Sequence, residues 1–244
     1  MLKSDTKFKP ILRFAAMSDI HYKSEHTVER DRFELALKTL YDYADNSKSY
    51  NRLDALCVVG DFANHGAEAE MQAFNNSLDK FIRPETALII SYASHEHMEA
   101  GQDAASEKLK RIFGKEPDVH EIINGFHFIS LSTSKSETSV RCGFDAAKRE
   151  WFRAECEKAI ADNPQKPVFM FQHPHPENTV YGSKEWDNGD LYPIQKDYPM
   201  LITFSGHSHA PINDPRSIHQ RDFTSLGCGT LSYFELDEFD KVYG

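Results

Sequence analysis

Five short segments of the sequence contain residue types that bind metal ions, and each follows an apolar run that is typical of a β-strand. The apolar runs cover residues 11–17, 55–59, 87–92, 168–172 and 201–205. The segments that follow them are Asp19-Ile20-His21, Gly60-Asp61, Ser94-His95-Glu96, His173 and Gly206-His207-Ser208-His209. Because ligands bind at the carboxyl ends of strands in open α/β sheets, these separated positions can converge on one site. Carboxylates and imidazoles gathered at one site predict a bound divalent metal.

Each of these residues has a more ordinary explanation when it is taken alone. A single aspartate at a strand end usually caps or closes a turn, and a single histidine is more often a surface or packed residue than a ligand. Asp19 or His173 by itself would therefore be weak evidence of a metal site. The ordered set of five segments is what favours metal binding.

The order and spacing of the segments resemble the calcineurin-like metallophosphoesterase superfamily, whose pattern runs D-x-H, G-D, G-N-H-(E/D), H and G-H-x-H. The resemblance spans Asp19 to His209, which is most of the chain. Within the superfamily, the pattern looks most like the bacterial cyclic-nucleotide phosphodiesterase group, which shares G-H-x-H. One segment departs from the pattern, because Ala93-Ser94 stands where the family has Gly-Asn.

The resemblance implies a binuclear centre with two divalent metal ions, for which Mn, Fe and Zn are the candidates. Carried over residue by residue, it implies that the first metal is held by Asp19, His21, Asp61 and His209. Asp61 would bridge to the second metal, whose other ligands would be His173, His207 and whatever sits at Ser94. In this family the two metals clamp a bridging hydroxide that attacks the phosphorus of a phosphoester.

The resemblance also assigns a catalytic histidine. His95 matches the family's catalytic His, which contacts the phosphoryl oxygens and can protonate the leaving oxygen. Asn64 matches a position where the family often has Asp or Asn, and it would help to orient His95. The implied activity is a metal-dependent hydrolysis of a small phosphoester, with a phosphodiester favoured over a monoester.

Ser94 leaves two interpretations open. A serine hydroxyl is shorter than an asparagine side chain and is a poorer metal donor than an amide carbonyl, so the second metal should bind more weakly. In one interpretation the enzyme works with this weaker site. In the other, the site has decayed to a single-metal or inactive form, and the chain is a phosphate- or nucleotide-binding protein on the same scaffold. The neighbouring Glu96 is a possible replacement carboxylate, although it matches the family's own acidic position.

Helical spacing between the predicted strands indicates the fold. Between the first and second strands, and again between the second and third, apolar residues recur on one helical face. They are Phe33, Leu37, Leu40 and Ala44, then Met71, Phe74, Leu78 and Phe81. Such βαβ units predict a largely parallel sheet with right-handed crossovers. The family resemblance implies an α/β layered sandwich of two mixed β-sheets flanked by helices.

Turn and capping residues predict the remaining elements. Asn124-Gly125 predicts a tight hairpin between strands 119–123 and 126–132. Gly114 can end a short helix in a left-handed cap, and Asp145 can cap a further helix. Residues 222–226 and 230–236 are predicted to be another pair of strands.

Composition limits the class of protein. With 244 residues and 40% hydrophobic content, residues 1–244 can form one domain, and no linker or repeat divides them. The first ten residues lack the apolar core of a signal peptide, so a cytoplasmic protein without membrane contact is expected, or an exported one whose leader has been removed. The net charge of −10 argues against a long nucleic-acid partner. The chain ends after an acidic segment with no closing helix, which fits either a truncated or a natural end.

Four cysteines lack the C-x-x-C spacing of metal or redox motifs, so buried reduced thiols are expected at Cys57, Cys142, Cys156 and Cys228. Among the other histidines, His97 and His175 are near the site in sequence, and His65 neighbours Asn64. Ordinary surface or packing roles are expected for His26, His120, His127 and His219. The segment 177–192 contains Tyr181, Trp186 and Tyr192, and it is either a stacking platform for a base or sugar or a self-packed loop.

Overall fold

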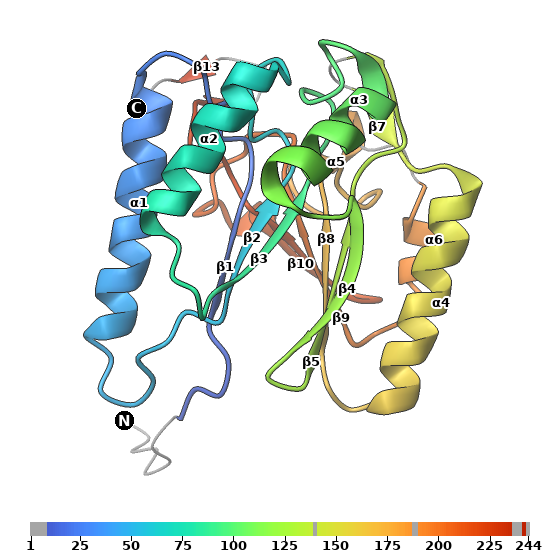
Figure 1. Cartoon of the computed structure of the whole chain (residues 1–244). Coiled ribbons are helices and arrows are strands. Elements are labelled where there is room, and N and C mark those ends of the chain that lie inside the picture. The colour runs from blue at the N-terminus through green and yellow to red at the C-terminus, as the bar shows by residue number, and fades with distance from the viewer. Residues whose placement is uncertain (1–8, 139–140, 187–189, 236–240, 243–244) are drawn as a thin grey trace.

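The computed structural model describes residues 9–138, 141–186, 190–235 and 241–242 of the chain. Two β-sheets lie face to face between two groups of helices (Figure 1). The first sheet has the parallel strands β1 (Phe14–Met17), β2 (Ala55–Val59) and β3 (Ala87–Ser91), in that order. This arrangement confirms the predicted two-sheet α/β fold.

The second sheet is mixed and has the order β10-β11-β9-β8-β5-β4. Its central pairs are parallel, and the pairs at its two edges, β4 with β5 and β10 with β11, are antiparallel. The strands are β4 (Asp118–Ile123), β5 (Phe126–Leu131), β8 (Val168–Gln172), β9 (Leu201–Ser205), β10 (Ile218–Gln220) and β11 (Thr224–Gly227). The first sheet is parallel in all its described pairings, so only the second is mixed.

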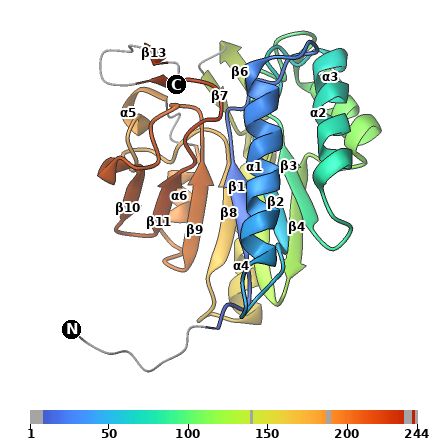
Figure 2. The same cartoon turned by 90° about the vertical axis from the view of Figure 1, so that its left-hand side faces the viewer.

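The predicted helices are present with the predicted faces buried. Helix α1 (Val28–Asp45) and helix α2 (Glu68–Phe81) cover the outer face of the first sheet, and α4 (Ala146–Asp162) covers the second (Figures 1 and 2). The short helices are α3 (Gly101–Lys108), a π-helical turn (Leu109–Phe113), α5 (Ser183–Trp186), α6 (Tyr192–Gln195) and a 3₁₀ turn (Pro215–Ser217). No described helix is both long and apolar enough to cross a membrane.

Strand β2 illustrates why the sheets need cover on both faces. Leu56 and Val58 pack with the α1 and α2 side, whereas Ala55, Cys57 and Val59 pack between the sheets. All five side chains are buried, as expected for a strand covered on both sides. The space between the sheets is filled mainly by aromatic rings, among which are Phe14, Phe128, Phe169, Phe171 and Phe204.

Local signals were accurate where the turn or cap chemistry is specific. Asn124 and Gly125 have φ of 51° and 77° and join antiparallel β4 and β5. Asp145 accepts a 2.9 Å hydrogen bond from the backbone N–H of Lys148 at the start of α4. Gly114 ends the π-helical turn with φ of 63°. These three predictions are confirmed.

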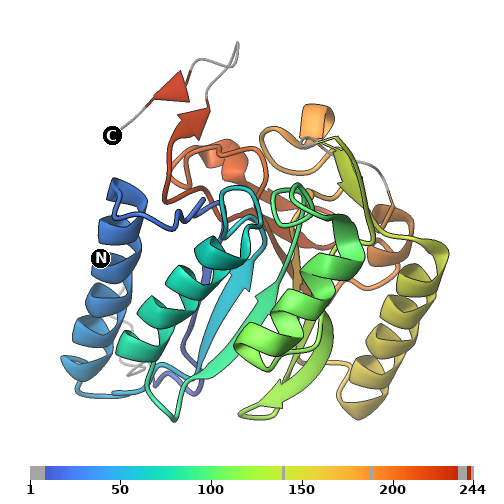
Figure 3. The same ribbon diagram turned by 45° about the horizontal axis from the view of Figure 1, so that its top comes forward.

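The predicted strand pair near the C-terminus is wrong. Strand β11 pairs with β9 and β10, so no edge is left on it for residues 230–236. After a turn at Gly229 with φ of 68°, residues 230–233 form no strand and cross over to Asp19. Among the described residues, strand β12 (Phe234–Glu235) pairs with β13 (Lys241–Val242) alone, in a small ribbon that projects from the layers (Figure 3). A second small ribbon joins β6 (Lys135–Thr138) to β7 (Arg141–Gly143).

The cysteines lie where the sequence suggests. Cys57, Cys142 and Cys156 are buried and Cys228 is half-buried, and none of the four forms a disulfide. Burial raises the pKa of the Cys57 thiol well above its usual value. These thiols are therefore protonated packing groups at neutral pH.

Candidate metal centre

The loops after β1, β2, β8 and β9 meet at one end of the two sheets and are tied to one another through the main chain. The N–H of His21 donates to the carbonyl of Asp61 at 3.1 Å, and the N–H of Gly206 donates to the carbonyl of His173 at 3.0 Å. The segments found in the sequence are thus brought together.

Five of the candidate ligands have a left-handed backbone conformation. Positive φ values of 49° to 73° occur at Asp19, His21, Asp61, His207 and His209. Non-glycine residues rarely adopt positive φ, and they keep it only where the surroundings hold them there. Because the strain is concentrated at the candidate ligands, their placement is imposed by the tertiary structure and is typical of a functional site.

A first group of possible ligand atoms comes from Asp19, His21 and His209. The Nε2 atoms of His21 and His209 are 3.0 Å apart, and Oδ1 of Asp19 is 3.2 Å from Nε2 of His209. The other oxygen of Asp19, Oδ2, accepts hydrogen bonds from the Ser18 hydroxyl and from the N–H of His207. Oδ1 is buried and has no hydrogen-bond donor among the described residues.

A second group comes from Asp61, His173 and His207. Nε2 of His173 is 2.9 Å from Oδ2 of Asp61 and 3.1 Å from Nδ1 of His207. The two groups are adjacent, because the same Nε2 atom is 3.8 Å from Oδ1 of Asp19. Asp61 and His21 also form a third group with His95.

The proton positions on two rings follow from their partners. Nδ1 of His173 is 2.8 Å from the carbonyl of Val59, and Nδ1 of His209 is 2.9 Å from the carbonyl of Tyr233. A carbonyl only accepts hydrogen bonds, so Nδ1 carries the proton in both neutral rings and Nε2 presents a lone pair. These lone pairs face carboxylate oxygens, an arrangement that a cation between them would stabilise. The residues therefore fit a divalent metal.

Without a metal, the negative charge of the carboxylates favours a proton on the neighbouring His173. Burial lowers the pKa of His173, but the carboxylates of Asp61 and Asp19 outweigh it and raise the pKa to about 10. His21 is different, because burial and the neighbouring His95 and His209 lower its pKa to about 3. Burial would raise the pKa of Asp61, but His173 and His95 hold it well below its usual value.

We expect the affinity for Mn²⁺ to rise with pH between about 6 and 9, because a metal must displace the His173 proton. A folded-state pKa of about 10 means that the proton is bound throughout this range, so lower pH favours the proton over the metal. With one proton released, affinity should rise about tenfold per pH unit. Calorimetric titrations in two buffers of different ionisation enthalpy would measure the proton release. Binding without proton release would contradict the protonated state of His173.

His95 lies at the edge of this cluster. Its backbone N–H donates to Oδ1 of Asp61 at 2.9 Å, and its Nδ1 is 2.6 Å from the main-chain carbonyl of Asn64. Its Nε2 is 4.0 Å from Oδ2 of Asp61. The side chain of Asn64 contacts the exposed ring of His65 instead. Asn64 therefore contacts His95 through its main-chain carbonyl.

Ser94 is buried beside Asp61. Its hydroxyl donates to the Asp61 carboxylate, at 3.1 Å from Oδ2 and 3.3 Å from Oδ1. A hydroxyl that donates to a candidate bridging carboxylate still has lone pairs, but its proton is committed to Asp61.

The overall sequence and fold identify the family. A profile of the calcineurin-like phosphoesterase family matches residues 12–211. The chain belongs to this family. The match covers most of the chain and includes every segment that contributes to the two ligand groups. Members of this family are phosphoesterases that use divalent metals, so membership supports a hydrolase activity for this chain. The two ligand groups are the candidate metal sites.

Solved structures with a similar fold include two phosphatases. A dimetal phosphatase from Danio rerio aligns with a TM-score of 0.64 and 11% identity over 91% of this chain and 88% of that one. A purple acid phosphatase from yellow lupin seeds aligns with a TM-score of 0.60 and 13% identity, over 89% of this chain and 44% of that one. A protein from Thermus thermophilus aligns with a TM-score of 0.52 and 13% identity, over 96% of this chain and 98% of that one. A search of curated protein sequences found no significant match.

Glu96 supports the loops that carry the candidate metal ligands. Its carboxylate accepts hydrogen bonds from the backbone N–H groups of Asp61, Ala63 and Ala93, at 3.0, 2.8 and 2.8 Å. Both oxygens are therefore engaged with the loops after β2 and β3. Glu96 holds the two loops together, and this geometry does not favour it as a replacement metal ligand.

His175 contacts two serines of strand β9 and of the loop that follows it. Its Nδ1 and Nε2 are each 2.7 Å from a hydroxyl, of Ser205 and Ser208 respectively. Burial lowers its pKa to about 3, so the ring is neutral. Ser208 lies between His207 and His209, and the sequence offered no signal for its role except its place in the G-H-x-H segment. His97 is buried, with Nε2 at 3.4 Å from the Thr133 hydroxyl.

The two histidines of the β4–β5 hairpin lie in a hydrogen-bonded chain. Nε2 of His120 and Nδ1 of His127 are 2.7 Å apart, and Glu155 and Asp162 of α4 lie at the two ends. This fits the predicted packing role.

The described aromatic residues of segment 177–192 contact protein groups. The Arg216 guanidinium lies 3.7 Å from the centre of the Tyr181 ring, and the Tyr192 hydroxyl donates to Asp222 at 2.7 Å. The carbonyl of Tyr181 accepts from the Ser208 hydroxyl at 3.2 Å, so the segment borders the loop that carries the candidate ligands His207 and His209. These contacts favour the self-packed loop. The side chain of Trp186 lies outside the described part of the chain.

Proposed function

We propose that this chain is a binuclear metal-dependent phosphoesterase that hydrolyses a small phosphodiester. In this proposal the first metal is held by Asp19, His21, Asp61 and His209, and the second by Asp61, Ser94, His173 and His207. Mixed carboxylate and imidazole donors suit Mn, Fe or Zn. The family membership supports the hydrolase, and the ligand assignment and the diester preference are our proposals.

One observation carries the binuclear proposal. Oδ1 of Asp19 is buried without a hydrogen-bond donor among the described residues, and it lies between the two groups, 3.2 Å from Nε2 of His209 and 3.8 Å from Nε2 of His173. Burying a charged oxygen without a partner is costly, so a cation is the partner that its position calls for. Asp61 belongs to the second and third groups, which supports a bridging role.

The protein groups have separable roles in this reaction. When bound, two divalent cations supply charge neutralisation at the phosphate and activation of water at neutral pH. His95 is held through its Nδ1–H by the Asn64 carbonyl, so its Nε2 is the atom that can contact a phosphoryl oxygen and, in the imidazolium form, deliver its proton to the leaving oxygen. Because only Nδ1 is used for orientation, Nε2 is left to act as the general acid.

Activity and metal content tested together would decide the function. Purified protein reconstituted with Mn²⁺ should contain two ions per chain and hydrolyse bis(p-nitrophenyl) phosphate faster than p-nitrophenyl phosphate. Faster hydrolysis of the monoester would overturn the diester preference alone. Two bound ions with no hydrolysis of either ester would overturn the proposed activity.

A second candidate is favoured by the Ser94 contact. A serine hydroxyl is a poorer metal donor than an amide carbonyl, and the Ser94 hydroxyl is already hydrogen-bonded to Asp61 at 3.1 Å. The chain could therefore instead be a phosphate- or nucleotide-binding protein with a single metal. One ion or none per chain, together with nucleotide binding and no turnover, would favour this binder over the enzyme.

We expect Ser94→Asn to tighten the second metal by about tenfold, which corresponds to about 1.4 kcal/mol, since an amide carbonyl is a better ligand than a hydroxyl. Activity should rise at limiting Mn²⁺ and change little at saturation. Activity measured against Mn²⁺ concentration would show this. Ser94→Ala is the matched control, because it also removes the hydrogen bond to Asp61 but adds no ligand, and it should not tighten binding. An unchanged metal curve in Ser94→Asn would mean that the loop does not admit the amide.

A further inference from the structure

Residues 230–235, here called the strap, run alongside the first ligand group. The Thr230 hydroxyl donates to the carbonyl of Asp19 at 2.8 Å, and the N–H of Leu231 approaches the same carbonyl at 3.3 Å. The N–H of Glu235 donates to the carbonyl of His209 at 3.3 Å. The strap therefore contacts the main chain of two candidate ligands that are far apart in the sequence.

Tyr233 of the strap contacts the imidazoles themselves. Its carbonyl accepts the hydrogen bond from Nδ1 of His209 at 2.9 Å. Its ring centre lies 4.4 Å from the ring centre of His209 and 6.1 Å from that of His21, nearly parallel to the latter at 22°. Partners of this kind fix both the tautomer and the orientation of a metal-binding histidine.

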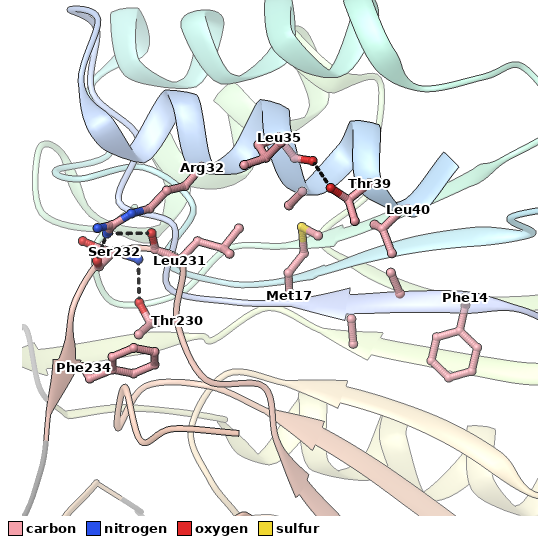
Figure 4. Close-up of a pocket in the computed structure, with 13 residues that line it drawn as sticks. Phe14, Met17, Arg32, Leu35, Thr39, Leu40, Thr230, Leu231, Ser232 and Phe234 are labelled. Carbon is pink, nitrogen blue, oxygen red and sulfur yellow. Dashed lines mark hydrogen bonds between the residues drawn. The ribbon is translucent and has the colours of Figure 1, made fainter. Parts of the chain in front are cut away.

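Arg32 holds the strap from helix α1. Its Nη1 donates to the carbonyl of Ser232 and lies 3.4 Å from the carbonyl of Leu231, and the N–H of Ser232 donates to the Thr230 hydroxyl at 2.9 Å (Figure 4). An apolar groove of about 720 Å³ lies between α1 and the strap (Figure 4). The groove is lined by side chains such as Met17, Leu35, Leu231 and Phe234. Through these hydrogen bonds, Arg32 holds the strap at a set distance from helix α1.

The backbone conformation of two candidate ligands gives the strap a structural role. Asp19 and His209 both have φ of 53°, which an isolated loop would relax toward negative values. The strap bonds to the main-chain carbonyls of both residues, and it therefore opposes that relaxation.

We propose that the strap is a positioning element for the first metal, with Thr230 and Tyr233 acting directly on the ligand residues and Arg32 acting through the strap. The proposal rests on the proposed metal site and adds residues that the metal-binding segments do not contain. None of the three is a ligand. Loss of any of them should weaken the first metal and leave the second group unchanged.

Calorimetric titration of the metal-free full chain with Mn²⁺ would test this. Thr230→Val keeps the side-chain shape and removes the donor to Asp19, and Arg32→Ala removes the contact from α1. Both should weaken the first Mn²⁺ by roughly 10–100-fold, the usual effect of losing a group that supports a ligand. In a His207→Ala background, which removes a ligand of the second group, the same loss should appear in a single binding step. Lys38→Ala is the matched control, because Lys38 is an exposed cation on α1.

The outcomes separate the strap from the function. Wild-type affinity in both Thr230→Val and Arg32→Ala would overturn the strap proposal and leave the proposed function standing. Weakening of the second step alone would also overturn it. Absence of Mn²⁺ binding by the wild-type chain would overturn the proposed function and the strap with it. Arg32→Lys keeps a donor for the carbonyls and should recover part of the affinity, which a general loss of packing would not show.

Discussion

Replacement of His95 by alanine is expected to lower kcat by about 10²–10⁴ and to leave the metal content unchanged, because general-acid catalysis contributes about that much. His95 is oriented by the Asn64 carbonyl at 2.6 Å and is half-buried at the edge of the metal groups. Its ring is not needed for either of the proposed ligand sets. Steady-state kinetics at saturating Mn²⁺, with metal analysis of the same samples, would measure both quantities.

His65→Ala is the matched control for His95→Ala. His65 is an exposed histidine in the same loop as Asn64, and its Nδ1 lies 2.8 Å from the Asn64 side chain and 3.5 Å from the Glu70 carboxylate, away from the candidate ligands. It should have wild-type kcat. Loss of metal from His95→Ala would instead assign His95 as a ligand, in the third group with His21 and Asp61. Such a result would remove His95 from the general-acid role.

Gly206→Ala should disrupt the first metal and destabilise the fold. A Cβ at Gly206 would lie 1.8 Å from the Ser18 hydroxyl oxygen and 2.4 Å from Oδ2 of Asp19. These atoms are buried and hydrogen-bonded to each other at 2.6 Å, so they cannot move without displacing Asp19. Overpacking of this kind costs about 1–3 kcal/mol and sometimes more. Urea unfolding of the metal-free protein and Mn²⁺ titration would measure the two effects.

Gly227→Ala provides the control for Gly206→Ala. The nearest atom to a Cβ at Gly227 is 3.7 Å away, in the side chain of Ser217, which is ordinary contact. Its free energy of unfolding and its Mn²⁺ affinity should stay close to those of the wild type. If Gly206→Ala also bound Mn²⁺ with wild-type affinity, Asp19 would not be held by the packing described here. The same result would remove Asp19 from the first ligand set.

The sequence by itself was sufficient for the features that depend on local chemistry. Asn124 and Gly125 both tolerate positive φ, so the hairpin could be read directly from two letters. The buried faces of α1 and α2 followed from helical spacing, and the five segments with candidate metal ligands followed from their residue types and order. The role of the segment residues as ligands stays a prediction, as does the single domain over residues 1–244.

Other features depend on which chain segments meet, and the sequence could not supply them. Asn64 was expected to help to orient His95, and the contact is made by its main-chain carbonyl, which every residue type has. The direction of the Ser94 hydroxyl depends on Asp61, which is 33 residues away. Residue type therefore carried no signal for either contact.

The tertiary structure alone decided the strap and the strain at the ligands. Thr230 and Asp19 are separated by 211 residues, and their contact depends on the turn at Gly229 and on the edges of β11 being occupied. Residues 230–236 have apolar and aromatic residues that suit a strand, but no sheet edge is left for them on β11. Positive φ at Asp19 and His209 is unfavourable locally, and such distant contacts help to maintain it. The residue types of the candidate site are visible in the sequence because its chemistry requires them. Its geometry is not, because long-range packing holds Asp19 and His209 in backbone conformations that these residues disfavour locally.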